Sequence, residues 1–341
     1  MITGRHLKRI LALALYATGI TRLVFFWQFK IRKKILVLLY HEIRPPRNRF
    51  EAAVSPDNFE RQIRFVRRHF EIIPVSRMME FMVGRVKIRK PVAVITFDDG
   101  YKDNFTTAYP ILKKLGAPAI IFTTVGSVGN KNRMWTSVVE DLFGRTPKKE
   151  VELSSLPSGR VFEWPDEGEE KLRACHEIKA EMKKVPDTVR QAILDELRAK
   201  LEVQEDSCGS GEEMLSWDDI RELGKGPLIE IGSHSLTHRM LAKLPSAEMI
   251  YELRESGKKL REEAGIEVRY VSYPGNSYNA EVQKCAADAG YQAGFAVDRR
   301  LNGLNENRFG LRRVHIEDDP MYVFQAEISL LVPFIYSVCG K

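Results

Sequence analysis

The ten residues Val92-Ala-Val-Ile-Thr-Phe-Asp-Asp-Gly-Tyr101 decide the fold of this chain. Residues 92–96 form an unbroken apolar and β-branched run, which is typical of a strand buried on both faces of a parallel sheet. The run leads to two adjacent carboxylates, Asp98 and Asp99, and then to Gly100, a residue that favours turns. Two carboxylates at the end of a buried strand are costly to desolvate unless a cation or ordered donors compensate their charge. The stretch is therefore either a plain strand-ending turn or a strand that carries acidic ligands to a metal ion.

A pair of histidines follows a later apolar stretch. His234 and His238 stand in the sequence Gly-Ser-His-Ser-Leu-Thr-His, directly after the apolar residues 228–231. Their i, i+4 spacing places both rings on one face if a helix begins here, so that both can reach one ion. Two histidines and one carboxylate are a common catalytic set for a divalent metal, with a position left open for water. We expect one divalent ion, with zinc as the first choice and cobalt, nickel, iron or manganese as alternatives.

Strands and helices alternate along most of the remaining sequence. Strand-like runs lie at residues 35–39, 72–74, 92–96, 119–123, 229–231, 270–273, 293–297 and 312–316. Helical patterns lie at residues 58–69, 104–115, 217–223, 246–264 and 280–289, with Ser76 and Ser216 as expected caps and Gly116 as an expected helix end. This rhythm predicts an α/β fold built on a parallel sheet or barrel.

The rhythm stops between about residues 126 and 216. This interval is too long for a single loop in a compact domain, and residues 171–184 and 188–202 have helical patterns. We interpret it as a mostly helical insertion that serves as a lid, a partner surface or decoration. Its Trp135 and Trp164 could stack on sugar rings, although isolated tryptophans more often pack in a core.

The first 34 residues combine positive charge with an apolar stretch. The chain has a formal net charge of +7 and a pI near 9.1, but outside residues 5–9 and 30–34 its basic residues are mixed with acidic ones. Cations that flank the apolar residues 10–29 favour an anionic membrane surface over nucleic acid as a partner. Residues 1–34 therefore predict an in-plane amphipathic anchor, with a poor transmembrane helix and a signal peptide as alternatives.

The four cysteines and the carboxyl-terminal tail carry less information. Cys175, Cys208, Cys285 and Cys339 are widely separated and form no CxxC pair. They indicate neither a disulfide scaffold nor a thiolate metal site, and a reducing compartment is the mild preference. Residues 321–341 are an apolar tail, which we expect to pack on the core or to touch the membrane.

Three motifs fall at the carboxyl ends of predicted strands: the aspartate pair, the histidine pair and Tyr273-Pro274-Gly275. In parallel α/β folds these ends share one face, where active sites are built. The chain here resembles the polysaccharide deacetylase family, the metal-dependent carbohydrate esterases with a NodB-type domain. The matching motifs are Thr96-Phe97-Asp98-Asp99-Gly100-Tyr101, Ser233-His234-Ser235-Leu236-Thr237-His238, Leu39-Tyr40-His41 and Leu215-Ser216-Trp217. The resemblance covers residues 35–316 apart from the insertion.

The resemblance implies a fold and a set of roles. The fold is a distorted (β/α) barrel with about seven parallel strands, in a NodB-like domain over residues 35–320. Asp99, His234 and His238 would bind the metal, and Asp98 would act as the catalytic base. The implied general acid is His315, and the implied substrate contacts are the backbone N–H of Tyr101, as oxyanion donor, together with His41, Tyr273, Pro274 and Gly275.

Two departures concern the residues around the base. Many family members have an arginine before the proline of the third motif, but the equivalent place near Ser272 holds none, and no aromatic residue separates Pro274 from Gly275. Three arginines could supply the missing charge, namely Arg269, Arg312 and Arg313.

Taken together, the motifs predict a metal-dependent hydrolase that removes N-acetyl groups from a sugar in a glycan or in a lipid-linked glycan precursor. The alternatives are an amidase or deformylase of the same fold, or a catalytically silent glycan-binding module. We expect a membrane-associated protein at the cytoplasmic face of the inner membrane, or one anchored with its catalytic domain outside. The sequence predicts no particular oligomeric state.

Overall fold

The computed structural model describes residues 4–129, 134–156, 159–203 and 214–331. Its main sheet is a half-barrel of seven parallel strands in the order β10-β1-β3-β4-β7-β8-β9, and the short β2 pairs with the start of β3. The strands are β1 (Ile35–Tyr40), β2 (Glu71–Ile72), β3 (Val92–Phe97), β4 (Ala119–Thr123), β7 (Ile229–Ser233), β8 (Tyr270–Ser272), β9 (Ala293–Phe295) and β10 (Val314–His315). The predicted parallel α/β fold with about seven strands is confirmed.

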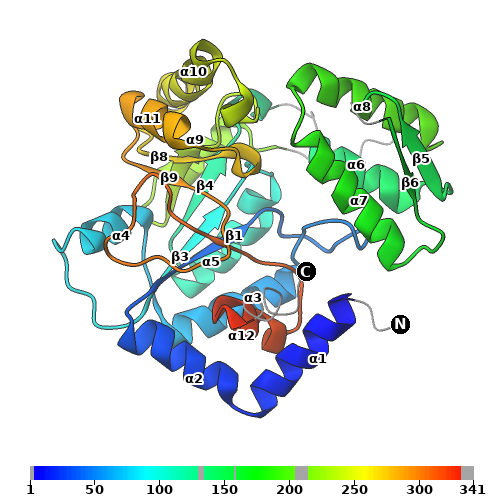
Figure 1. Cartoon of the computed structure of the whole chain (residues 1–341). Coiled ribbons are helices and arrows are strands. Elements are labelled where there is room, and N and C mark those ends of the chain that lie inside the picture. Colours follow the sequence, from blue (N-terminus) through cyan, green and yellow to red (C-terminus); the bar gives the residue numbers. More distant parts are fainter. Residues whose placement is uncertain (1–3, 130–133, 157–158, 204–213, 332–341) are drawn as a thin grey trace.

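Helices cover the outer face of this half-barrel (Figure 1). They are α3 (Pro56–His69), α5 (Tyr109–Leu115), α9 (Trp217–Gly224), α10 (Ser246–Ala264) and α11 (Ala280–Asp288). Alternate strand residues, such as Leu36 and Leu38 of β1, pack under these helices. The residues between them, such as Ile35 and Val37, face inward and pack against α4 (Val75–Met82). This period of two fixes which side chains point into the half-barrel.

The helix ends follow the sequence signals with one exception. Ser216 and Asp219 form a capping box at the start of α9, and Gly116 ends α5 in the left-handed conformation with φ of 60°. A π-helical turn (Asn104–Ala108) precedes α5. Ser76, however, does not cap α4, because the Glu230 carboxylate accepts the backbone N–H groups of Val75 and Ser76 at 2.7 and 3.1 Å.

The insertion forms a lobe of its own beside the half-barrel (Figure 1). It contains α6 (Trp135–Arg145), α7 (Glu169–Met182), α8 (Asp187–Lys200) and an antiparallel hairpin of β5 (Glu150–Leu153) and β6 (Arg160–Glu163). The hairpin was not expected from the sequence. Trp164 is fully buried in the core of this lobe and donates its indole N–H to the Lys148 carbonyl at 2.7 Å, so it is a packing residue.

The first helices are part of the folded core rather than a separate tail. These are α1 (Gly4–Ala17), α2 (Ile20–Phe26) and a π-helical turn (Trp27–Ile31). Phe29 is 2% exposed and its ring packs on Phe70 at 4.8 Å between centroids. Among the described residues no single helix is both long and apolar enough to cross a bilayer; residues 8–17 and 20–31 meet that test only as a pair, which is bent by 78°.

A buried ion cluster ties α1 to α12 (Met321–Ile328). The Lys8 ammonium is 8% exposed and lies 3.3 Å from Glu317, 2.8 Å from Asp319 and 2.5 Å from Glu327. Glu317 lies two residues after His315, so this cluster also holds the segment that follows β10. Of the predicted apolar tail, residues 332–341 lie outside the described residues, as do Cys208 and Cys339; Cys175 and Cys285 are free thiols.

Candidate active site

Six polar side chains extend the inward-facing rows of five strands. His41 follows β1, Asp98 follows β3 and His234 follows β7, each two residues after an inward-facing position. Ser272 is the last residue of β8, and Arg313 and His315 share the inward face of β10 because Val314 and Ile316 pack outward under the helices. The strand period therefore brings side chains from distant parts of the sequence to one end of the half-barrel.

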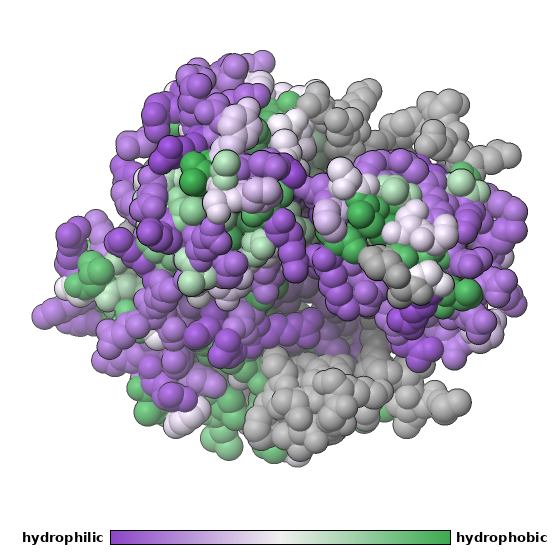
Figure 2. Space-filling view, turned by 45° about the horizontal axis from the view of Figure 1, so that its top comes forward, coloured by the Kyte–Doolittle hydropathy of each residue, from purple (hydrophilic) through white to green (hydrophobic). Residues whose placement is uncertain are grey.

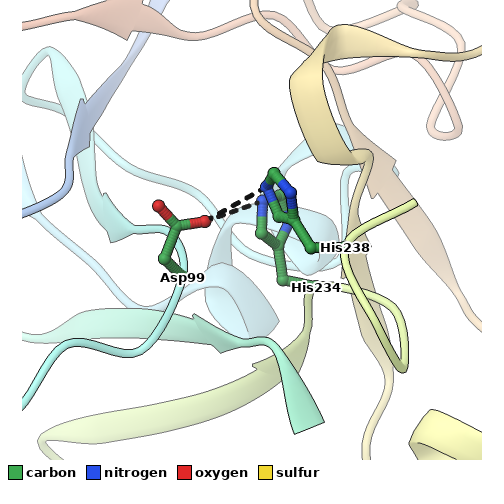
Figure 3. A group of neighbouring side chains, drawn as sticks. All are labelled: Asp99, His234 and His238. Atoms are coloured by element: carbon green, nitrogen blue, oxygen red, sulfur yellow. Dashed lines mark ion pairs between the residues drawn. The ribbon is translucent and has the colours of Figure 1, made fainter. Parts of the chain in front are cut away.

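Asp99, His234 and His238 meet at this end with the geometry of a metal site (Figure 3). Oδ1 of Asp99 lies 3.4 Å from Nε2 of His234 and 3.3 Å from Nε2 of His238. Three ligand atoms at about 2.1 Å from a tetrahedral ion are about 3.4 Å apart, so the observed spacing suits such an ion. Oδ1 of Asp99 is buried and accepts no hydrogen bond from the described residues. The donor set thus fits the expected divalent metal.

Strained turns, not a helix, present these ligands. The expected helix start at the histidine pair is wrong, because Ser235 and His238 adopt positive φ values of 61° and 59°. The hydroxyl of Ser235 accepts the backbone N–H of His238 at 3.0 Å and closes the turn. Asp99 also has a positive φ of 72°. Nδ1 of His234 lies 2.9 Å from the Ser272 carbonyl, and donation to this oxygen leaves Nε2 for the metal.

Asp98 is held by an arginine that directly precedes the edge strand β10, two strands away in the sheet. The two terminal nitrogens of the Arg313 guanidinium, Nη1 and Nη2, each donate to one carboxylate oxygen of Asp98 at 2.7 Å. The Ser272 hydroxyl donates to the same carboxylate at 3.0 Å. Arg313 is fully buried. Burial alone would raise the pKa of Asp98, but the charge and hydrogen bonds of Arg313, together with the neighbouring histidines, outweigh burial and keep the pKa below its ordinary value. Asp98 is therefore an ionised carboxylate with a fixed orientation.

Arg313 is the one of the three candidate arginines that reaches Asp98. Arg312, its neighbour in sequence, points outward and pairs with Glu306 at 3.0 Å. Arg269 lines a different cavity, together with residues of α4. The sequence does contain a signal that distinguishes Arg313 from Arg312. The apolar Val314 and Ile316 mark the outward face of the strand, and because side chains alternate, Arg312 shares their face and Arg313 points inward.

His41 and His315 form a second pair beside the aspartates. Their rings make an edge-on contact with centroids 5.2 Å apart. Burial, together with the neighbouring His41, lowers the pKa of His315 to about 3, and burial lowers the pKa of His41. Both imidazoles are therefore neutral at neutral pH.

One cavity of about 350 Å³ joins these groups. Nine of the ten residues proposed from the sequence line it: His41, Asp98, Asp99, Tyr101, His234, His238, Tyr273, Gly275 and His315. The tenth, Pro274, is buried and lies outside the lining. The insertion supplies a further wall, made of Trp135, Thr136, Ser137, Glu140, Lys179 and Lys183. Apart from Trp135, no residue of this wall was identified from the sequence, because its position depends on how the insertion packs against the half-barrel.

A His-His-Asp set beside a clamped carboxylate, at the carboxyl ends of parallel strands, defines a metal-assisted hydrolase. A family model described as polysaccharide deacetylase matches residues 85–294, well over half of the chain. The chain belongs to the polysaccharide deacetylase family, whose members hydrolyse N-acetyl amide bonds of sugars. The predicted removal of N-acetyl groups from a glycan is confirmed at this level, and neither a different amide nor a silent binding module is favoured.

Known proteins resemble the chain over most of its length. The putative polysaccharide deacetylase YxkH of Bacillus subtilis (strain 168) is 21% identical over 291 residues, which cover 83% of this chain and 71% of that protein. The poly-beta-1,6-N-acetyl-D-glucosamine N-deacetylase of Staphylococcus aureus (strain MRSA252) is 22% identical over 277 residues, which cover 78% and 69%. The Streptococcus pyogenes deacetylase PplD in complex with acetate has a TM-score of 0.57 at 17% identity, over 86% of this chain and 97% of that one, and shows the same fold.

Proposed function

We propose that this chain removes the acetyl group from N-acetylglucosamine-type units of a glycan or a lipid-linked glycan precursor, with zinc bound by Asp99, His234 and His238. The observation that carries the proposal is the Asp98 carboxylate, which Arg313 clamps at 2.7 Å beside the three ligands in one cavity. The name of the Staphylococcus aureus relative, a poly-beta-1,6-N-acetyl-D-glucosamine N-deacetylase, supports the choice of sugar. The two-nitrogen, one-oxygen donor set supports zinc.

The chain's own residues divide the work of amide hydrolysis. A divalent ion in this site would polarise the amide carbonyl and lower the pKa of a water ligand. Asp98 takes the proton of the attacking water, because Arg313 keeps it ionised and aimed into the cavity. The backbone N–H of Tyr101 donates to the oxyanion that forms at the carbonyl. Tyr273 and Gly275 form the facing wall against which the sugar rests.

His315 is the proposed general acid for the leaving amine. At neutral pH its lowered pKa of about 3 leaves it without a proton to give in the free protein. The negative charge of the tetrahedral intermediate raises the proton affinity of a neighbouring imidazole, so His315 takes up the proton that Asp98 removed from the attacking water and passes it to the leaving amine. His41 packs against the His315 ring and keeps its orientation.

Metal content and acetate release, measured together, test these roles. Asp98→Asn should keep one equivalent of zinc and lose turnover on β-1,6-linked N-acetylglucosamine oligomers, whereas His234→Ala should lose both. Asp218→Asn is the control, since this carboxylate is exposed on α9 and, within the described part of the chain, pairs with Arg221 alone. Undiminished acetate release by Asp98→Asn would refute the role of Asp98 as the base. Failure of the wild type to bind a divalent ion after reconstitution would refute the metal site.

We further propose that α1, α2 and the following π-helical turn rest on an anionic membrane surface, at the cytoplasmic face of the inner membrane. Seven large apolar side chains of these elements are exposed by 40% or more: Ile10, Leu13, Ile20, Leu23, Phe26, Trp27 and Ile31. Four exposed cations accompany them and form no ion pair with a described residue: Arg22, Lys30, Arg32 and Lys33. Figure 2 shows hydrophobic residues at the lower edge of the molecule, besides smaller hydrophobic groups elsewhere on a mostly hydrophilic face. Apolar side chains with adjacent cations are the composition that binds anionic bilayers.

Vesicle flotation tests the membrane proposal without disturbing the core. The triple change Leu23→Ser, Phe26→Ser and Trp27→Ser alters only exposed positions and should abolish binding to vesicles that contain phosphatidylglycerol. Val83→Ser, which alters a comparably exposed side chain outside these helices, should leave binding unchanged. Equal flotation of the triple variant and the wild type would refute the surface, and a topology assay with a protease on intact cells separates the cytoplasmic from the external arrangement.

A further inference from the structure

The insertion forms one wall of the catalytic cavity, and this wall carries more positive than negative charge. Glu140 comes from α6 and Lys179 from α7, and they pair at 2.6 Å. Lys183 follows one helical turn after Lys179, so both side chains project from the same face of α7 toward the cavity. One carboxylate therefore faces two ammonium groups.

Each carboxylate that lines the cavity already has a partner. Glu42 accepts from Arg44 at 2.8 and 2.9 Å on the half-barrel side. The others are Asp98 with Arg313, Glu140 with Lys179, and Asp99 with His234 and His238. None of them is left to balance Lys183.

The ammonium group of Lys183 makes no ion pair and no hydrogen bond with the described residues, although this side chain lines the cavity. Desolvation and the charge of Lys179 lower the pKa of Lys183, and the weaker attraction of Glu140, which is already paired with Lys179, does not offset them. Its neighbour Lys184 points away from the cavity and pairs with Glu181 at 2.7 Å.

A second donor on the same wall also lacks an acceptor. The indole Nε1 of Trp135 is buried and has no hydrogen-bond partner among the described residues. Arg190 covers the ring at 5.4 Å, which holds it in place against the cavity. A buried N–H without an acceptor is costly, and a ligand oxygen would satisfy it.

We propose that Lys183 binds an anionic substituent of the glycan, a carboxylate or a phosphate on or next to the sugar that loses its acetyl group, and that Trp135 donates to an oxygen of the same unit. The substrate is then an acidic or phosphate-bearing N-acetylated glycan rather than a neutral one. This inference rests on the proposed function, because it assigns the cavity to a sugar. Lys183 is a specificity residue and takes no part in bond cleavage.

Binding of deacetylated sugars tests the inference, since these products are not turned over. Glucosamine, glucosamine 6-phosphate and muramic acid are titrated into the zinc-loaded wild type, Lys183→Met and Lys184→Met. A charge-assisted hydrogen bond predicts that an anionic sugar binds the wild type about tenfold tighter than glucosamine. Lys183→Met should lose this preference and keep the affinity for glucosamine, and Lys184→Met should behave as the wild type.

Each outcome decides a point. A preference for glucosamine 6-phosphate alone supports the inference and identifies phosphate as the substituent, and a preference for muramic acid alone identifies a carboxylate. Equal affinities for all three sugars would overturn it, and so would a Lys183→Met protein that weakens neutral and anionic sugars alike. Acetate release from the N-acetylated forms is measured in parallel. Its complete absence would count against the proposed function, whereas the binding measurements would still show whether Lys183 recognises the anionic substituent.

Discussion

Replacement of Arg313 by methionine should damage both stability and catalysis. The change leaves the Asp98 carboxylate, which is 2% exposed, without two hydrogen bonds of 2.7 Å and without its counter-charge. Loss of one partner of a buried ion pair costs about 3–5 kcal/mol. For a chain of 341 residues the unfolding entropy is about 0.7 kcal/mol/K, so the melting temperature should fall by about 4–7 °C. Misorientation of the base should lower kcat by about 10²-fold.

A double-mutant cycle shows whether the two residues act as a pair. In the Asp98→Asn background Arg313→Met should cost at least 2 kcal/mol less than in the wild type, as is typical of contacting charges. Calorimetry on the four proteins gives this coupling, and Arg312→Met serves as the control because its pair with Glu306 is partly exposed and worth about 1 kcal/mol or less. Additive losses within about 0.5 kcal/mol, or a melting temperature of Arg313→Met within 1 °C of the wild type, would refute the clamp.

The remaining predictions concern the ion cluster and a helix cap. Lys8→Met should lower the free energy of unfolding by about 3 kcal/mol or more, because the buried Asp319 and Glu327 and the partly exposed Glu317 lose their shared cation; a urea-unfolding difference below about 1 kcal/mol would contradict this. Burial raises the pKa of Glu327 from 4.5 to about 7, so the folded chain binds the extra proton and its stability falls as pH rises through that window. Glu327→Gln should therefore gain stability relative to the wild type between pH 5 and pH 8, and a constant difference would argue against the shift. Ser216→Ala should cost about 1 kcal/mol in thermal unfolding through loss of the capping box with Asp219, and no change would mean that the box is not formed in solution.

The half-barrel was predictable because its strands are buried on both faces. Residues 35–39, 92–96 and 119–123 are continuous apolar runs, and the structure extends them by two residues at most. Side chains alternate along a strand, so Asp98 lies on the same inward face as Val94 and Thr96. For this reason the two aspartates at the end of the strand could be predicted to form part of a site. The hairpin of β5 and β6 was missed although Val151 and Leu153 alternate with glutamates, because the charged surroundings suggested helices.

The site was predictable in its residue types but not in its local geometry. An i, i+4 spacing suggested a helix for the histidine pair, whereas the chain makes a turn at Ser235 that hydrogen bonds stabilise. Glu252 of α10 accepts the N–H groups of Leu236 and Thr237 at 3.0 and 2.8 Å, so the turn depends on a carboxylate 16 and 15 residues away from them in the sequence. Contacts of this range leave no periodic signal in a sequence. The cavity wall that the insertion provides could not be predicted either, because it also depends on contacts between residues far apart in the sequence.

The bent helices at the start of the chain have one face that packs on the rest of the domain and another face that is exposed and apolar. Lys8 and Phe29 fasten them to α12 and to Phe70, so no flexible linker lies between these helices and β1. A domain fastened in this way cannot swing over a surface to which its first helices attach. Its catalytic cavity would stay at a fixed distance from that surface and at a fixed angle to it, and only glycan units at that distance would be within reach.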